Sequence, residues 1–124
     1  MRSTQRKGDA AVAKAIATFT MLGHDVSLPM TESAAYDLVV DCKGQLKKVQ
    51  VRFFSGKLVE LRRIHSNSQG YVIKKTKKNA YDWLYALSEH NVEYLIKECL
   101  DGRRSITPQP QHILQPIDIR NAKL

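Results

Sequence analysis

Three neighbouring segments decide the fold of this sequence: Tyr36-Asp37-Leu38-Val39-Val40-Asp41, the turn Cys42-Lys43-Gly44-Gln45, and Lys47-Lys48-Val49-Gln50-Val51-Arg52-Phe53-Phe54. β-Branched and aromatic residues gather in the two longer stretches, which is typical of strands. A short glycine-containing segment between two such runs predicts a β-hairpin.

The second strand of this hairpin has two chemically different faces. Since side chains alternate along a strand, one face carries Val49, Val51 and Phe53, and the other carries Gln50, Arg52 and Phe54. Two polar groups, Gln50 and Arg52, therefore share a face.

A helix is predicted before the hairpin, over residues 4–22. Its apolar residues recur at helical spacing, and Gly23 stands where a C-cap glycine belongs. The apolar series is Val12, Ala15, Ile16, Phe19 and Leu22, and the other positions include Arg6, Lys7 and Lys14. The helix is therefore expected to have an apolar and a basic face.

The remaining segments give weaker signals. Val26-Ser27-Leu28-Pro29 predicts a short extended segment that ends at the proline. Residues 58–64 and 71–73 are strand candidates, separated by an exposed loop at 65–70. Residues 83–87 and 92–96 favour a second hairpin over a helix.

The C-terminal part contains three prolines that break regular structure. It still carries apolar residues able to dock onto the body: Ile106, Ile113, Leu114 and Ile117. With 124 residues in total, we expect one domain over 1–124, with a core at about 4–98 and an extension at 99–124.

Composition narrows the class of protein. No apolar run approaches the roughly 18 residues that span a bilayer, so we expect a cytoplasmic protein with no membrane partner. Cys42 and Cys99 are expected to be reduced, partly buried thiols, and the spacing of cysteines and histidines does not favour zinc. The net charge of +8 favours a polyanionic partner such as nucleic acid, although a solvated basic surface also explains it.

Several motifs occur in the order seen in one nuclease superfamily. Four segments together resemble PD-(D/E)XK enzymes linked to group I introns: Lys7-Gly8-Asp9, Leu22-Gly23-His24-Asp25-Val26 with Pro29, residues 36–40, and Val49-Gln50-Val51-Arg52. The resemblance covers about residues 6–98, and archaeal Holliday-junction resolvases are more distantly similar. It implies an α/β, restriction-endonuclease-like core with the N-terminal helix packed on a mixed central β-sheet.

The resemblance also implies a catalytic site. Asp37 would be a ligand of Mg²⁺, which prefers oxygen ligands, and Gln50 would offer a carbonyl oxygen beside it. Arg52 stands where the family has a lysine, and Val12 stands where it tends to have a glutamate. Arginine binds phosphate but is a poor proton carrier. Asp9, one helical turn before Val12, is the candidate replacement ligand.

Simpler interpretations exist for these residues. Asp37 could cap a turn or strand edge, and Val12 fits the apolar helix face. The basic residues form either a solvated face or a phosphate-binding surface. The candidates for phosphate binding are Arg6, Lys7, Arg62, Arg63, His65, Lys74, Lys75, Lys77 and Lys78. The aromatic rings near the lysine run, Tyr71, Tyr81 and Trp83, favour a place in the core over base stacking.

Three hypotheses for function result. The first is a Mg²⁺-dependent, homing-type DNA endonuclease that hydrolyses phosphodiester bonds, with double-stranded DNA as partner. The second is a degenerate nuclease that binds DNA or structured RNA without turnover. The third is a protein-interaction domain whose charge only keeps it soluble. A chain this small offers limited surface for a long target, which favours a homo-oligomer.

Overall fold

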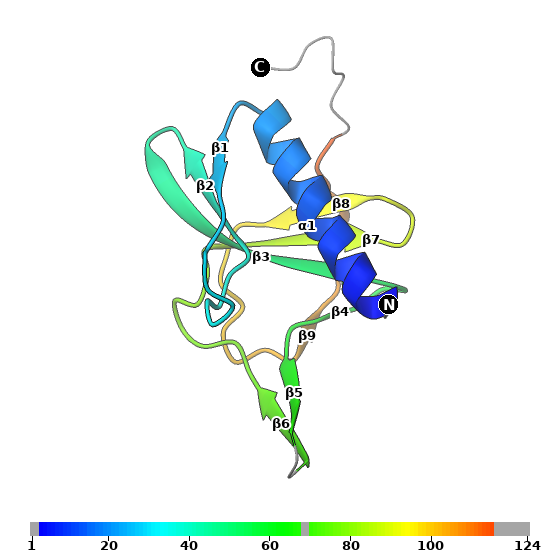
Figure 1. The fold of residues 1–124 in the computed structure, drawn as a ribbon. Helices are drawn as coiled ribbons and strands as arrows, with labels where there is room; N and C mark the ends of the chain where they lie inside the picture. The colour runs from blue at the N-terminus through cyan, green and yellow to red at the C-terminus, as the bar shows by residue number, and fades with distance from the viewer. Residues whose placement is uncertain (1–2, 68–69, 116–124) are drawn as a thin grey trace.

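The computed structural model describes residues 3–67 and 70–115. The elements in chain order are α1 (Ser3–Met21), β1 (Asp25–Ser27), β2 (Leu38–Cys42), β3 (Gln45–Phe54), β4 (Val59–Glu60), β5 (Arg63–Asn67), β6 (Gly70–Lys74), β7 (Trp83–Ser88), β8 (Glu93–Ile96), β9 (Ser105–Ile106) and the 3-10 helix η1 (Pro110–His112). The long N-terminal helix lies across a mixed sheet (Figure 1).

The central sheet has five strands in the order β1-β2-β3-β7-β8. The β3–β7 pair is parallel and the other neighbours are antiparallel. Both predicted hairpins are confirmed as β2–β3 and β7–β8. Lys43 and Gly44 have φ angles of 55° and 84° in the first turn, which is the left-handed backbone that a tight two-residue hairpin requires.

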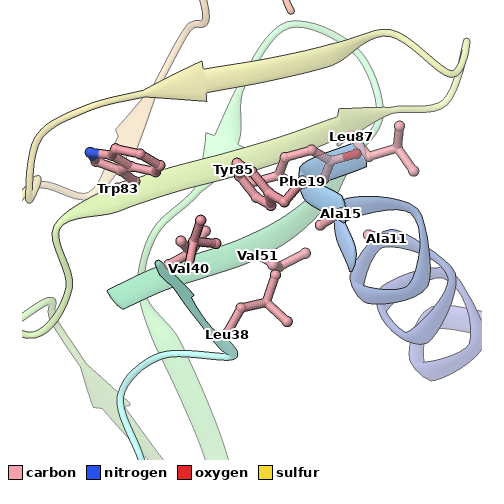
Figure 2. Packing of buried hydrophobic residues seen from close by; sticks show 10 residues of the cluster. Ala11, Ala15, Phe19, Leu38, Val40, Val51, Trp83, Tyr85 and Leu87 are labelled. Carbon is pink, nitrogen blue, oxygen red and sulfur yellow. The ribbon is translucent and has the colours of Figure 1, made fainter. Parts of the chain in front are cut away.

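One face of the sheet packs on α1. Ala11, Ala15 and Phe19 of the helix are buried against the face of β3 that carries Val49 and Val51 (Figure 2). The predicted division of β3 into two faces is therefore confirmed. The helix ends at Met21, and Gly23, with a φ of 91°, follows it in the C-capping turn, where His24 N–H donates to Phe19 O and Gly23 N–H to Thr20 O.

The opposite face of the sheet carries a second apolar cluster. Its buried members are Phe54, Val59, Leu61, Tyr81, Leu84, Ala86, Ile96, Leu100 and Ile106. Ile106 reaches this cluster because β9 pairs with β4. Further along, Leu114 packs on the first cluster and Ile113 bridges to Tyr94, whereas Ile117 lies outside the described residues. The described residues after Gly102, as far as residue 115, thus dock on the body as expected.

The region between β3 and β7 differs from the sequence prediction. The single strand expected over 58–64 is divided into β4, which pairs with β9, and the start of β5, which pairs with β6. The exposed loop expected at 65–70 is wrong for His65, Ser66, Asn67 and Gly70, because these residues form the β5–β6 ladder. The hairpin is a separate two-stranded sheet outside the main one, and the run His65-Ser66-Asn67 is polar, so the local sequence predicts a loop there.

Other sequence expectations concern single residues. Cys42 and Cys99 are free, partly buried thiols, and Tyr81 and Trp83 are buried in the core. Within residues 3–67 and 70–115, no helix is long and apolar enough to cross a membrane.

A carboxylate joins the helix to the far edge of the sheet. Glu93 Oε2 accepts a hydrogen bond from the Tyr85 hydroxyl at 2.6 Å and another from the Thr18 hydroxyl at 2.5 Å. Tyr85 is fully buried, and this burial, together with the neighbouring Glu93 carboxylate, raises the Tyr85 pKa well above its ordinary value.

This raised pKa predicts a loss of stability at alkaline pH. Above about pH 10 the unfolded chain releases the Tyr85 proton while the folded chain keeps it, so the free energy of unfolding falls as pH rises, by about 1.4 kcal/mol per pH unit. Urea unfolding between pH 9 and 11 measures this slope. Tyr85→Phe should make the slope shallower, and equal slopes in the two proteins would contradict the prediction.

Candidate active site

Asp37 lies immediately before β2 and is held by β3. Its backbone N–H donates to Val49 O at 2.8 Å, and its Oδ2 accepts hydrogen bonds from Val51 N–H at 2.8 Å and from Gln50 Nε2 at 3.0 Å. The Asp37 carboxylate therefore acts as the hydrogen-bond acceptor for the Val51 N–H of β3, just before β2 begins. The structure brings Asp37 and Gln50 into direct contact.

Gln50 and Arg52 face a hollow of about 180 Å³. Its floor is the polar face of β3, and its walls come from the loop before β2, the chain between β6 and β7, and Leu61. The lining residues are Ser33, Ala35, Gln50, Arg52, Leu61, Lys75, Thr76, Lys77, Ala80 and Tyr81. We call it the basic hollow.

The charged side chains that line the basic hollow are all positive. Arg52, Lys75 and Lys77 contribute three cationic side chains, and no carboxylate is among the lining residues. Tyr81 stays protonated at its wall, because burial raises the pKa of its hydroxyl more than the positive charge of Arg52 lowers it. A cationic hollow with a protonated phenol suits an anion such as a phosphate group.

A second hollow, of about 370 Å³, lies between the start of α1 and the end of β3. Thr4, Lys7 and Gly8 line it from the helix side, and Arg52 borders both hollows. Lys7 Nζ lies 5.5 Å from the centroid of the Phe53 ring, which keeps this cation beside β3. The path from Lys7 across Arg52 to Lys77 is therefore positively charged along its length.

The two helix residues considered as metal ligands differ in environment. Asp9 is exposed on α1 and lines neither hollow. Val12 is partly buried and packs on the first apolar cluster, so it has the packing role expected of a helix apolar position.

The oxygen atoms at Asp37 fit a magnesium ion in part. One carboxylate and the Gln50 amide oxygen are hard ligands of the type Mg²⁺ takes, and Mg²⁺ commonly binds one or two carboxylates plus water and phosphate oxygens. Among the residues that the structure describes, no group of three His, Cys, Asp or Glu side chains comes together to hold a metal. Asp37 and Gln50 thus suit an ion that takes its other ligands from water and substrate.

The other predicted phosphate-binding residues fall into three groups. Arg6 and Lys78 are exposed, on α1 and in the loop before β7 respectively. Arg62 donates to Glu60 Oε1 at 2.8 Å, and this bond lowers the Glu60 pKa. Arg63, His65 and Lys74 lie on β5 and β6, where only the backbone is described.

Three polar residues that line the basic hollow were not predicted as site residues from the sequence. Ser33 lies in an irregular loop and gave no site signal, whereas Tyr81, beside the lysine run, was expected in the core rather than in base stacking. Thr76 could have been noticed as the only uncharged residue within the run Lys74–Lys78. Its hydroxyl contacts Leu61 O at 3.5 Å across the hollow.

The fold and this site define a class of protein. A helix on a mixed sheet, with a carboxylate before one strand and a polar-x-basic triplet on the next, is the arrangement expected from the resemblance. The sequence profile of PD-(D/E)XK endonucleases matches residues 2–101, and the chain belongs to this family.

A solved structure supports the same assignment. The chain is similar to a bacterial homing endonuclease, I-Ssp6803I, with a TM-score of 0.73 and 28% sequence identity over 99% of this chain and 85% of that one. No curated protein sequence matches the chain.

Proposed function

We propose that this chain binds double-stranded DNA and hydrolyses its phosphodiester bonds with Mg²⁺, as a homing-type endonuclease. One observation carries the proposal: the Asp37 carboxylate accepts a hydrogen bond from Gln50, whose side chain lines a hollow together with Arg52, Lys75 and Lys77. The family membership and the similarity to a homing endonuclease support it.

Each group has a separate task in this proposal. Asp37 and Gln50 would hold Mg²⁺, which would supply positive charge to stabilise the phosphate and to help activate a water. Arg52 binds a non-bridging oxygen of the phosphate that is cut, because its planar guanidinium matches phosphate geometry. Lys75 and Lys77 bind the neighbouring backbone, and Lys7 extends the contact towards α1.

A degenerate nuclease that binds DNA or structured RNA is the second candidate function. Two observations favour it: Val12 packs in the core where a carboxylate would otherwise stand, and Arg52 is a poor proton carrier. In either case a homo-oligomer is proposed, because one chain of 14.1 kDa offers little surface for a long target.

Cleavage and gel-shift assays on the same DNA separate the two candidates. Supercoiled plasmid and mixed linear duplexes are incubated with the protein in Mg²⁺ and, as control, in EDTA. Cutting that requires Mg²⁺ supports the endonuclease. Tight, salt-sensitive binding with no cutting in any metal supports the degenerate nuclease, and no retention of DNA or RNA at low salt would contradict both.

The basic hollow predicts a particular salt dependence of binding. Lys75→Gln with Lys77→Gln should lower the slope of log K against log salt concentration by about 2, since each lost phosphate contact removes about 0.9. Fluorescence anisotropy between 50 and 200 mM salt, a range of about fourfold, measures this slope. Lys14→Gln with Lys97→Gln removes the same charge from residues that do not line the hollow, and an equal drop there would refute the assignment.

A further inference from the structure

Gly8 lies inside α1, where glycine is an unfavourable residue. The helix runs from Ser3 to Met21, so Gly8 is more than one turn from either end. Glycine loses more conformational freedom than alanine when a helix forms. Gly8 is not among the glycines with a positive φ, so an alanine could adopt the same backbone conformation. The helix itself therefore gives no reason for a glycine at this position.

Packing does not require a glycine there either. A β-carbon built on Gly8 would meet no atom of the described residues within 4 Å, its chain neighbours and the backbone of α1 aside. Gly8 lines the second hollow, of about 370 Å³, together with Thr4 and Lys7 of α1 and residues 51–55 at the end of β3. We call it the helix hollow. The missing side chain therefore leaves room in this hollow and makes no room for another part of the described chain.

The residues that line the helix hollow suit a phosphate group. The charged ones are Lys7 and Arg52, and no carboxylate is among the described residues that line it. Thr4 and Ser55 add hydroxyl groups, which bind phosphate oxygens in protein–DNA complexes. The first turn of α1 has no acidic residue that would repel an anion. The space beside Gly8 is therefore open to the same kind of ligand as the basic hollow.

We infer that the helix hollow binds the DNA backbone next to the phosphate held in the basic hollow, and that Gly8 lets this backbone approach α1 closely. Arg52 borders both hollows, so one DNA strand can pass across it from one hollow to the other. Glycine is the usual residue where a protein backbone must come close to a ligand. The inference rests on the proposed DNA binding, and it assigns to Gly8 and Lys7 contact with the same phosphate.

Gly8→Ala tests the inference because its effects on stability and on binding should have opposite signs. The alanine should raise the melting temperature by about 3–5 °C, since it is the better helix former. It should weaken binding to a fluorescein-labelled duplex of mixed sequence by about tenfold at low salt, because its methyl group occupies space that the DNA backbone needs. Ala13→Ser adds one atom at an exposed position of α1 outside the hollow and should leave the affinity unchanged. A Gly8→Ala protein that is more stable and binds the duplex normally overturns the inference but leaves the proposed DNA binding intact.

The salt dependence of binding to the same duplex shows whether Gly8 and Lys7 serve one phosphate. Lys7→Gln and Gly8→Ala should each lower the slope of log K against log salt concentration by about 0.9, the value for one phosphate contact. The double variant should lose no more than either single variant. A loss of about 1.8 in the double variant would mean two separate phosphates and would overturn the shared contact. If the unmodified protein retains no duplex DNA at low salt, the proposed function itself fails.

Discussion

Asp37→Asn is expected to lower the rate of Mg²⁺-dependent DNA cleavage by about a thousandfold or more, which corresponds to about 4 kcal/mol of transition-state stabilisation. The substitution removes the negative charge but keeps an oxygen that can accept the Val51 N–H. The fold should therefore persist, whereas alanine would leave this backbone donor without its acceptor, at about 1–3 kcal/mol. Single-turnover cleavage at saturating protein measures the effect, and thermal unfolding verifies the fold.

Asp41→Asn is the matched control for this prediction. Asp41 lies near the end of β2, and its Oδ1 accepts a hydrogen bond from Gly44 N–H in the hairpin turn, which an asparagine oxygen can also accept. Its cleavage rate should stay within about twofold of the unmodified protein, because a loss of 0.4 kcal/mol or less changes a rate by roughly that factor. Full activity in Asp37→Asn would show that this carboxylate does not hold the metal.

The main elements of the fold could be predicted because each buries a face. The alternation in β3 separates Val49 and Val51, which pack under α1, from Gln50 and Arg52, which face the basic hollow. The helix could be predicted for the same reason, because Ala15 and Phe19 recur at helical spacing and are buried. Periodicity is informative wherever one side of an element meets a core.

The same reasoning explains where prediction failed. The β5–β6 hairpin lies outside the five-stranded sheet, and its residues His65, Ser66 and Asn67 are all polar, so this part of the sequence looked like a loop. The division between β4 and β5 also depends on long-range pairing of Val59 with Ile106, which local sequence does not encode. Propensity cannot supply a partner that lies more than forty residues away, so such pairings are found only in the structure.

The candidate site likewise contains some features that could be predicted from the sequence and others that could not. The contact between Asp37 and Gln50 follows from hairpin register, because residues near the start of one strand face the middle of the next. The walls of the basic hollow come from three separate loops, and only the charge of Lys75 and Lys77 marked them in advance. Ser33 reaches the site through the path of the chain, so no local pattern identifies it.

Arg52→Lys is expected to raise the cleavage rate by about tenfold to a hundredfold, because a lysine in this place can both bind the phosphate and transfer a proton, and proton transfer contributes about 10²–10⁴ in enzymes. Arg52 is half-buried with its Nε shielded from solvent, a setting in which a lysine pKa is readily lowered towards neutrality. The gain should grow as pH rises until the lysine has lost its proton, so rates measured between pH 6 and 9 give the test.

Arg62→Lys makes the same chemical change outside the hollows, at the ion pair with Glu60, and should leave cleavage unchanged. A gain confined to Arg52→Lys would mean that the scaffold, metal ligands and phosphate contacts are intact and that proton transfer is the limiting step. A rate below that of the unmodified protein would mean the opposite: the guanidinium contributes more by holding the phosphate than a shorter ammonium can, and arginine is the functional residue of this site.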